Sequence, residues 1–482
     1  MKRGEFFGSC NLSPAARRVL SCALLLALPS CDPNAFLEPP VKPFGESDEF
    51  VVLVRNAPIT RFLGADGRYS GIEQDLLELF VKDMGTRLRV VEHSAIDKIL
   101  AQLRRRRAHL AAVGIAATPQ RRDELQFGPA YLSVDTVVVY NTGSRRPKNI
   151  HDLVGKRVVV LAGSRAAQQL GEELLREPAL RWKEVVADDA MGLLDKLSNG
   201  EVDYVLCASN IAQQAQLFSP SIRRAFNIGL PETLSWALPK EADPQLVDRV
   251  DKFFARIKAD GTLGVLMDRY FGHIERLTQA DIALFLERRS SVLHHYRGTF
   301  QEAQELTGID WRLLAALGFQ ESHWNPLATS PTGVRGLMML TSETADRLGV
   351  SDRLDPHQNI LAAARYLKIL KDTLPQRIAE PDRTWMALAS YNVGYGHLED
   401  ARILAVRQGL NADSWVDLKK SLPLLARSDF YTTLKRGFAR GGEAVILTEN
   451  IRNYYDILVR YEEAYEPLWS GFLDAEDMPI MP

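Results

Sequence analysis

One carboxylic acid in this sequence ends a strongly apolar segment, where its surroundings can turn it into a proton donor. In the segment WRLLAALGFQES, Leu313, Leu317 and Glu321 are spaced by four residues, so a helix places them in one row on its inner face. Asp310 can cap the start of this helix, and Pro326 ends it soon after the acid. Burial against apolar neighbours raises the pKa of a carboxyl towards the ~6–7 that suits a general acid. The alternative is a glutamate at a loose helix end that points into water.

Two segments further along the chain can build a cleft near this acid. The tight turn GVRG is followed by an apolar run that contains Met338 and Met339. The later segment TWMALASYNVGYG predicts a short helix that ends at Tyr391 and Asn392, where two glycines break the pattern. We therefore expect an apolar lip close in sequence to the acid.

Four short motifs occur in order at the spacing of one domain. They are ES at Glu321 and Ser322, GLM at 336–338, SYN at 390–392 and ENIRNYYDIL at 449–458. In this order they resemble the motifs of lytic transglycosylase domains that have a goose-type lysozyme-like fold. The resemblance implies a mainly α C-terminal domain, and the helical patterns of this part of the chain agree with it.

The resemblance also implies an enzyme, a lyase that cleaves the β-1,4 bond between N-acetylmuramic acid and N-acetylglucosamine in peptidoglycan strands, from their ends or within them. Glu321 is then the single acid and base. It protonates the glycosidic oxygen and later takes the proton of the muramyl C6 hydroxyl, which leaves a 1,6-anhydromuramoyl end and needs no cofactor. The substrate's own N-acetyl oxygen replaces the second carboxylate that ordinary glycosidases use. The substrate-binding residues implied by the motifs are Ser322, Met338, Met339, Tyr391, Asn392 and Tyr454.

Two departures and two alternatives accompany this interpretation. The family more often has glutamine where Met339 stands, so a polar substrate contact is missing here. Hydrolysis by water, as in lysozyme, would use the same residues. A scaffold that binds glycan or peptide without catalysis is the other alternative, and the presence of Glu321 together with Tyr391, Asn392 and Tyr454 favours the enzyme.

The part of the chain from residue 49 to 272 shows a different pattern. Apolar runs alternate with helical patterns, which predicts parallel α/β units. The segments GIEQDL, TPQRRDELQFGPAY, NGEVDYVL and ADGTLGVLMDRYFG resemble the periplasmic solute-binding proteins of family 3, which take polar amino acids. This resemblance implies two α/β lobes with a ligand cleft between them.

The predicted ligand of this cleft follows from two arginines. In the family, an arginine of the TPxR pattern grips the ligand carboxylate, and Arg121 has this position; a guanidinium suits a carboxylate because it donates two parallel hydrogen bonds. Arg165 replaces a threonine of the family, and Cys207, Ala208 and Ser209 stand where the family has an acid for the ligand's ammonium group. We therefore expect an anionic ligand, such as a stem peptide or muropeptide that regulates the enzyme, or else a structural pair of lobes without a ligand.

The N-terminus has the features of an export signal. Basic residues precede VLSCALLLALPSC, an apolar run that is too short to span a membrane. The sequence LPSC resembles a lipoprotein cleavage box with Cys31 as the lipidated residue, and the alternative is an ordinary signal with a chance cysteine. We expect the envelope of a Gram-negative bacterium, with the protein lipid-anchored or peripheral on the periplasmic face of the outer membrane. Asp32 resembles an inner-membrane retention signal of enteric bacteria, so the choice of membrane stays open.

Composition sets the remaining bounds. The 482 residues carry a formal charge of −2, which gives no overall drive towards nucleic acid. If the signal is removed and Cys31 is lipidated, only Cys207 remains, so we expect no structural disulfide. The histidines lack metal-ligand spacing, and we expect no metal. The predicted multidomain order is a signal at 1–31, a tether at 32–48, the two-lobed α/β domain at 49–272 and the catalytic domain at 273–482.

Overall fold

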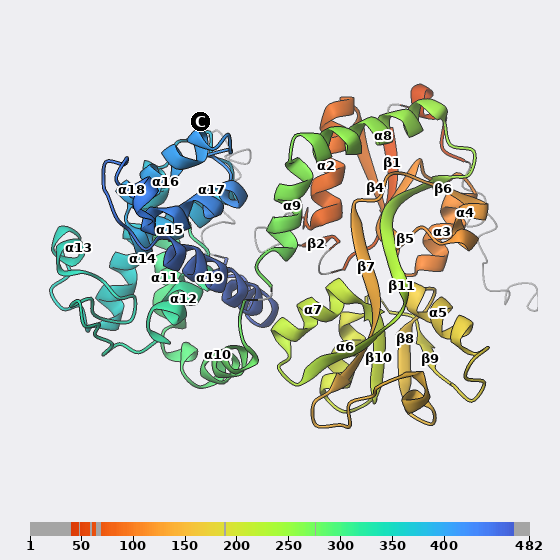
Figure 1. Cartoon of the computed structure of the whole chain (residues 1–482), viewed down its shortest axis with the longest axis horizontal. Helices are drawn as coiled ribbons and strands as arrows, with labels where there is room; N and C mark the ends of the chain where they lie inside the picture. The colour runs from red at the N-terminus through yellow and green to blue at the C-terminus, as the bar shows by residue number, and fades with distance from the viewer. Residues whose placement is uncertain are drawn as a thin grey trace, which may run out of the picture.

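The computed structural model describes residues 40–466, except 48, 58–59, 64–68, 188 and 275. It has an α/β part made of two lobes and a mainly helical part beside it, as predicted (Figure 1). Cys31, the signal and the last sixteen residues of the chain lie outside the described residues. Within the described ranges, no helix combines the length and the apolar character that a membrane crossing requires.

One mixed sheet runs through both lobes, with the strand order β4-β1-β5-β11-β7-β10-β8-β9 and with β6 paired to β11. The long strands β7 and β11 are antiparallel, from Leu132↔Leu234 to Asn141↔Ile222, and pass from one lobe to the other (Figure 1). The strands are β1 (Glu49–Val54), β4 (Arg87–Glu92), β5 (Leu110–Ala116), β6 (Leu125–Phe127), β7 (Leu132–Asn141), β8 (Val158–Leu161), β9 (Lys183–Val185), β10 (Tyr204–Ala208) and β11 (Ile222–Pro239), and β2 (Phe62–Leu63) pairs separately with β3 (Tyr69–Ser70).

The central strands β1 and β5 are apolar on both faces, and helices cover the sheet on each side. The segment FVVLV of β1 is completely buried, and so are all but one of the residues of β5. Aromatic rings fill the core of the first lobe, where Trp236 packs between Phe80 and Phe254. The covering helices are α2 (Ile72–Met84), α3 (Ile96–Arg104), α4 (Pro119–Glu124), α5 (Arg165–Glu173), α6 (Met191–Ser198), α7 (Ser209–Phe218), α8 (Pro244–Ala259) and α9 (Thr262–Phe271).

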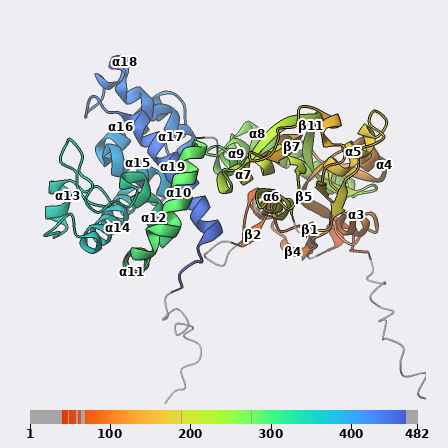
Figure 2. The ribbon, with the colours of Figure 1, turned by 90° about the horizontal axis from the view of Figure 1, so that it is seen from below.

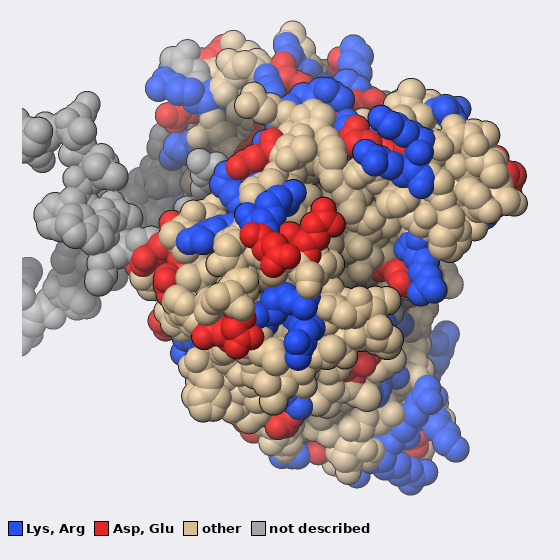
Figure 3. All heavy atoms as spheres, turned by 90° about the vertical axis from the view of Figure 1, so that its left-hand side faces the viewer, with Lys and Arg blue, Asp and Glu red and all other residues tan. Residues whose placement is uncertain are grey.

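The helical part surrounds one central helix, α12, in which Trp311–Phe319 are all buried. Figure 3 views this part from its outer side, where acidic and basic side chains are interspersed over most of the face. Its helices are α10 (Gln279–Ser291), α11 (Arg297–Thr307), α12 (Trp311–Ser322), α13 (Ser342–Arg347), α14 (Pro356–Thr373), α15 (Asp382–Val393), α16 (Tyr395–Arg407), α17 (Trp415–Ser421), α18 (Ser428–Tyr431) and α19 (Gly441–Tyr461).

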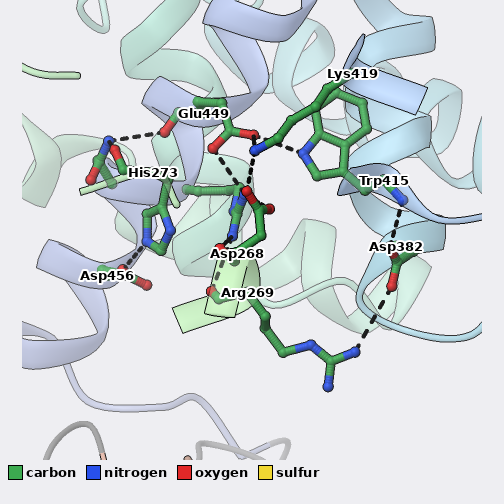
Figure 4. A network of polar contacts seen from close by, with 10 residues as sticks. Asp268, Arg269, His273, Asp382, Trp415, Lys419, Glu449 and Asp456 are labelled. Carbon is green, nitrogen blue, oxygen red and sulfur yellow. Dashed lines mark hydrogen bonds and ion pairs between the residues drawn. The ribbon is translucent and has the colours of Figure 1, made fainter. Parts of the chain in front are cut away.

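A buried polar network joins the end of the α/β part to the helical part (Figure 4). Asp268 on α9 forms ion pairs with Lys419 and with Arg452 of α19. The fully buried Glu449 accepts hydrogen bonds from the Trp415 indole at 2.7 Å and from Arg452 at 2.9 Å. Removing one partner from such a buried set leaves an uncompensated charge, so the network holds α9 firmly against α19.

Three further contacts make α9 and α19 a junction between all parts of the chain. On the side of the first lobe, Arg269 of α9 forms an ion pair with Asp75 at 2.8 Å. On the side of the second lobe, Arg460 of α19 forms an ion pair with Asp195 at 2.7 Å, and the hydroxyl of the neighbouring Tyr461 donates to the Phe218 carbonyl. The helical part therefore contacts both lobes, and it lies beside the α/β part in the two views of Figures 1 and 2.

Candidate active site

Helix α12 ends in a backbone reversal that fixes the position of Glu321. His323 and Trp324, which follow Ser322, both have positive φ, at 54° and 56°. Such values are strained for residues other than glycine and persist only where the surroundings hold them. The buried indole of Trp324 supplies this hold, because it donates to the Ala315 carbonyl two turns back at 2.8 Å.

The carboxyl of Glu321 lies where its charged form is poorly hydrated. Burial raises its pKa to about 8, so that the protonated form is favoured at pH 7. Tyr391 is a titratable neighbour, and burial together with the charge of Glu321 raises the pKa of its hydroxyl well above the ordinary value. The loose helix end that the sequence left open as an alternative does not occur.

Ser322 does not orient the acid directly. Its hydroxyl donates to the Leu337 carbonyl at 2.6 Å and accepts a hydrogen bond from the Asn325 amide at 3.0 Å. The side chain thus ties the end of α12 to the loop at 336–339, which contains the GLM motif.

The two methionines of this loop differ from each other. We predicted that both line the sugar cleft, and for Met338 this is wrong, because its side chain is fully buried. Gly318 of α12 leaves room for it: a Cβ there would lie 2.9 Å from the Met338 sulfur. Met339 is partly exposed and has a positive φ of 51°, so it can face the cleft. Periodicity could not separate them, since the chain turns at this point.

Tyr391 and Asn392 stand at the end of α15. The Tyr391 hydroxyl donates to the Met338 carbonyl at 2.7 Å, and its ring lies 5.4 Å from that of Tyr366. Asn392 is exposed at the helix end, where its amide is accessible to a ligand. Tyr391 thus supports the loop and interacts with Glu321 at the same time.

Tyr454 of α19 is a buried aromatic that packs against the C-terminal half of α12. Its ring stacks on Phe285 at 4.6 Å and meets the edge of Phe319, two residues before Glu321, at 4.8 Å. Tyr455 faces the opposite end of α12, where its hydroxyl donates to Asp310 at 2.9 Å. Of the two tyrosines, Tyr454 is the one near Glu321.

In the lobe cleft, both predicted ligand-binding arginines already bind other groups of the chain. The buried Arg121 donates to the carbonyls of Ala116 in one lobe and Gly163 in the other, each at 2.9 Å, and burial lowers its pKa to about 10. Arg165 forms ion pairs with Glu232 and Glu172. Both arginines are thus paired within the chain, and their predicted role towards a ligand stays a prediction.

The cleft retains two small cavities, of about 70 and 90 Å³, with mostly apolar walls. Asn210 and Gln214 of α7 line the smaller one, and their buried side-chain oxygens accept no hydrogen bond from the described residues. These amides stand just after the position where the family has its ammonium-binding acid. A ligand that donates hydrogen bonds, such as a peptide, would complete them.

The comparisons with known proteins agree with this architecture. Residues 298–409 match the family described as Transglycosylase SLT domain, and residues 50–273 match Bacterial extracellular solute-binding proteins, family 3. A membrane-bound lytic murein transglycosylase F of Nitrosospira multiformis is 47% identical over 460 residues, which are 95% of each chain. The chain belongs to the family of membrane-bound lytic murein transglycosylases F. The resemblance predicted for each half is confirmed.

Other members of this family are similar over nearly the same length. The relative from Thiobacillus denitrificans is 44% identical and covers 95% of this chain and 97% of its own. The relative from Methylobacillus flagellatus is 42% identical, with coverages of 88% and 90%. Among solved structures, a mutant of ArgBP from T. maritima is 22% identical and covers 47% of this chain and 96% of its own, with a TM-score of 0.43.

Sequence reasoning missed one residue beside the site, Asn359. It is fully buried on α14 and donates and accepts hydrogen bonds only with the backbone of other segments. The signal was present, since Asn359 stands four residues before Ala363 in a row that continues through Leu367, and an amide in an apolar row is unusual.

Proposed function

We propose that the chain is a lytic transglycosylase that cleaves peptidoglycan strands with Glu321 as its single acid and base. The observation that carries this proposal is a carboxyl at the end of a buried helix whose pKa burial alone raises to about 8. An acid that keeps its proton at neutral pH can protonate a leaving oxygen, which an exposed glutamate cannot do efficiently.

The reaction then proceeds in two proton transfers. Glu321 gives its proton to the glycosidic oxygen as the bond to the muramyl C1 breaks, and N-acetylglucosamine leaves with a free hydroxyl. The carboxylate so formed takes the proton of the C6 hydroxyl, whose oxygen attacks C1 and closes a 1,6-anhydro ring. Atoms balance without water, and Glu321 regains its proton. Met339, Asn392 and Tyr391 would border the sugar, while Ser322, Met338 and Tyr454 would support the acid and its loop.

Substitution of the acid tests this assignment. Glu321→Gln is nearly isosteric but neither donates nor accepts the proton, and we expect a loss of more than the ~10²–10⁴-fold usual for one acid-base group, because both steps use it. Glu443→Gln, at an exposed glutamate of the same domain, is the matched control and should keep full activity. Clearing of purified peptidoglycan by Glu321→Gln at more than a few per cent of the control rate would remove Glu321 from this role.

We also propose that the two lobes modulate the catalytic domain through α19. The network of Figure 4 attaches α19 to α9, and the ion pair of Arg460 with Asp195 attaches it to the second lobe. The same helix carries Tyr454 against Phe319 of α12. A change in the angle between the lobes would therefore act on the helix that packs beside Glu321. Such coupling is reciprocal: a lobe ligand would alter glycan affinity by the factor by which glycan alters that ligand's affinity.

A stem peptide or muropeptide is the ligand that we propose for the lobes. Its carboxylates would compete with the present partners of Arg121 and Arg165 for these two guanidinium groups. Its amide N–H groups would donate hydrogen bonds to the side-chain oxygens of Asn210 and Gln214. Calorimetry of the full chain with stem peptides and with free amino acids tests this, with Arg121→Ala as a control. Equal heats of binding, or no heat, for stem peptides, for free amino acids and for stem peptides with Arg121→Ala would mean that the lobes have only a structural role.

Attachment to the outer membrane through the N-terminus is the last part of the proposal. It rests on the signal-like sequence that ends at Cys31 and on the membrane-bound relatives. Fractionation of cells that express the chain with Cys31→Ala tests it, since loss of the lipid should move the protein from the outer membrane into the soluble periplasmic fraction. Unchanged outer-membrane recovery would instead support peripheral attachment.

A further inference from the structure

The loop that carries Met338 and Met339 is folded around the side-chain amide of Asn359. The Oδ1 atom of Asn359 accepts a hydrogen bond from the Met338 amide at 2.6 Å. Its Nδ2 atom donates to the Arg353 carbonyl at 3.0 Å and, more weakly, to the Arg335 carbonyl at 3.4 Å. This fully buried amide bonds only to backbone groups outside its own helix, so its hydrogen bonds determine the shape of the loop.

The loop itself is built to fit this amide closely. Gly336 has a φ of 89°, and a Cβ there would lie 2.4 Å from Nδ2 of Asn359 and 2.0 Å from the Arg353 carbonyl oxygen. Three residues later, Met339 also has a positive φ, which is strained for a residue with a side chain. The amide is the buried side-chain group that bonds to the Met338 amide between these two positions, so its loss would weaken the hold on this strain.

The loop in turn forms part of the surroundings of Glu321. Leu337 and Met338 pack directly on Gly318, one helical turn before the acid, where a Cβ would lie 2.9 Å from an atom of each. The Leu337 carbonyl accepts a hydrogen bond from Ser322, the residue after the acid. The Met338 carbonyl accepts a hydrogen bond from Tyr391, whose pKa is raised by the charge of Glu321. Movement of the loop would therefore admit water to the carboxyl.

We propose that Asn359 is a positioning residue for the reaction: it holds the loop at 336–339 against α12 and so limits the contact of Glu321 with water. This inference rests on the proposed role of Glu321 as the acid. Asn359 touches neither the acid nor the substrate and acts through the loop.

The pH profile distinguishes positioning from simple support of the fold. Glu321 must be protonated to act, so the basic limb of the rate should lie near pH 8 in the natural protein. Other titratable groups near the site should not change charge in the pH range of this limb. Burial raises the pKa values of Tyr391 and Tyr454 and lowers the pKa of His323. Entry of water would lower the pKa of Glu321, and the basic limb would move to lower pH.

The test compares Asn359→Asp with Asn141→Asp. Asn141, in the second lobe, has the same bonding pattern: its Oδ1 accepts from a backbone amide, and its Nδ2 donates to two backbone carbonyls. We expect Asn359→Asp to lower kcat by about 10²-fold, the loss typical of a displacement of about 1 Å, with a smaller change in KM. The basic limb is compared in the neutral Asn359→Ser, where it should lie at lower pH, because a new carboxylate would itself raise the pKa of Glu321. Asn141→Asp should lower the melting temperature but keep both kcat and the limb.

Asn359→Ser provides the second variant if the aspartate prevents folding, because serine leaves a smaller neutral group. A folded Asn359 variant with normal kcat and a normal basic limb would overturn the proposal, and so would an equal shift of the limb in Asn141→Asp. Failure here is separable from failure of the proposed function. Residual cleavage by Glu321→Gln contradicts the role of the acid, whereas a normal limb in Asn359→Ser contradicts only positioning.

Discussion

Replacing Glu321 by glutamine should stabilise the folded protein at neutral pH although it removes the activity. The carboxyl has a pKa of about 8 when folded and about 4.5 when unfolded, so unfolding releases a proton between these values. Raising the pH therefore lowers the free energy of unfolding, starting near pH 4.5 and ending near pH 8. The penalty at pH 7 is at most about 3 kcal/mol, and contact of the side chain with water reduces it.

Thermal unfolding of the natural protein and of Glu321→Gln at pH 5 and pH 8 measures this penalty. The constant differences between a carboxyl and an amide cancel when the two pH values are compared. We expect the variant to gain in melting temperature relative to the natural protein as the pH rises, while Glu443→Gln, at an exposed position, shows no such change. An equal difference at both pH values would refute the reasoning that burial raises this pKa.

Three further substitutions test the contacts around the site. Tyr391→Phe removes the hydrogen bond to the Met338 carbonyl, so it should lower the free energy of unfolding by about 1 kcal/mol in thermal unfolding and also lower the activity on purified peptidoglycan. Glu449→Gln leaves Lys419 and Arg452 with one buried carboxylate fewer and should destabilise the protein by about 3–5 kcal/mol, measured by denaturant unfolding. Arg121→Ala breaks the bridge between the lobes and should increase the radius of gyration in small-angle scattering; an unchanged radius would mean that other contacts hold the cleft closed.

Much of the helical site followed from spacing alone. The row Leu313, Leu317 and Glu321 predicted the helix that carries the acid, because a period of four needs only local geometry. The sequence did not show which of Met338 and Met339 faces inward. Gly336 and Met339 both have positive φ, and these turns set the side-chain directions in a way that periodicity does not predict.

Long-range partners were beyond the sequence. Arg121 and Arg165 read as two available cations, since nothing local shows that one reaches Gly163 and the other Glu232. The same limit applies to Asn359, which bonds to the nearby Arg353 carbonyl but also to Met338 and Arg335 in a loop, 21 and 24 residues earlier in the chain. Pattern predicts which helices and strands form, whereas the pairing of polar groups emerges only when these elements pack.

The central claim is that Glu321 closes an anhydro ring instead of activating water. Digestion of purified peptidoglycan in H₂¹⁸O, followed by mass spectrometry of the muropeptides, tests it most directly. We expect 1,6-anhydromuramoyl ends, which are lighter by one water than reducing ends and free of ¹⁸O, and none of them with Glu321→Gln. Reducing ends that carry ¹⁸O would show hydrolysis and contradict the account.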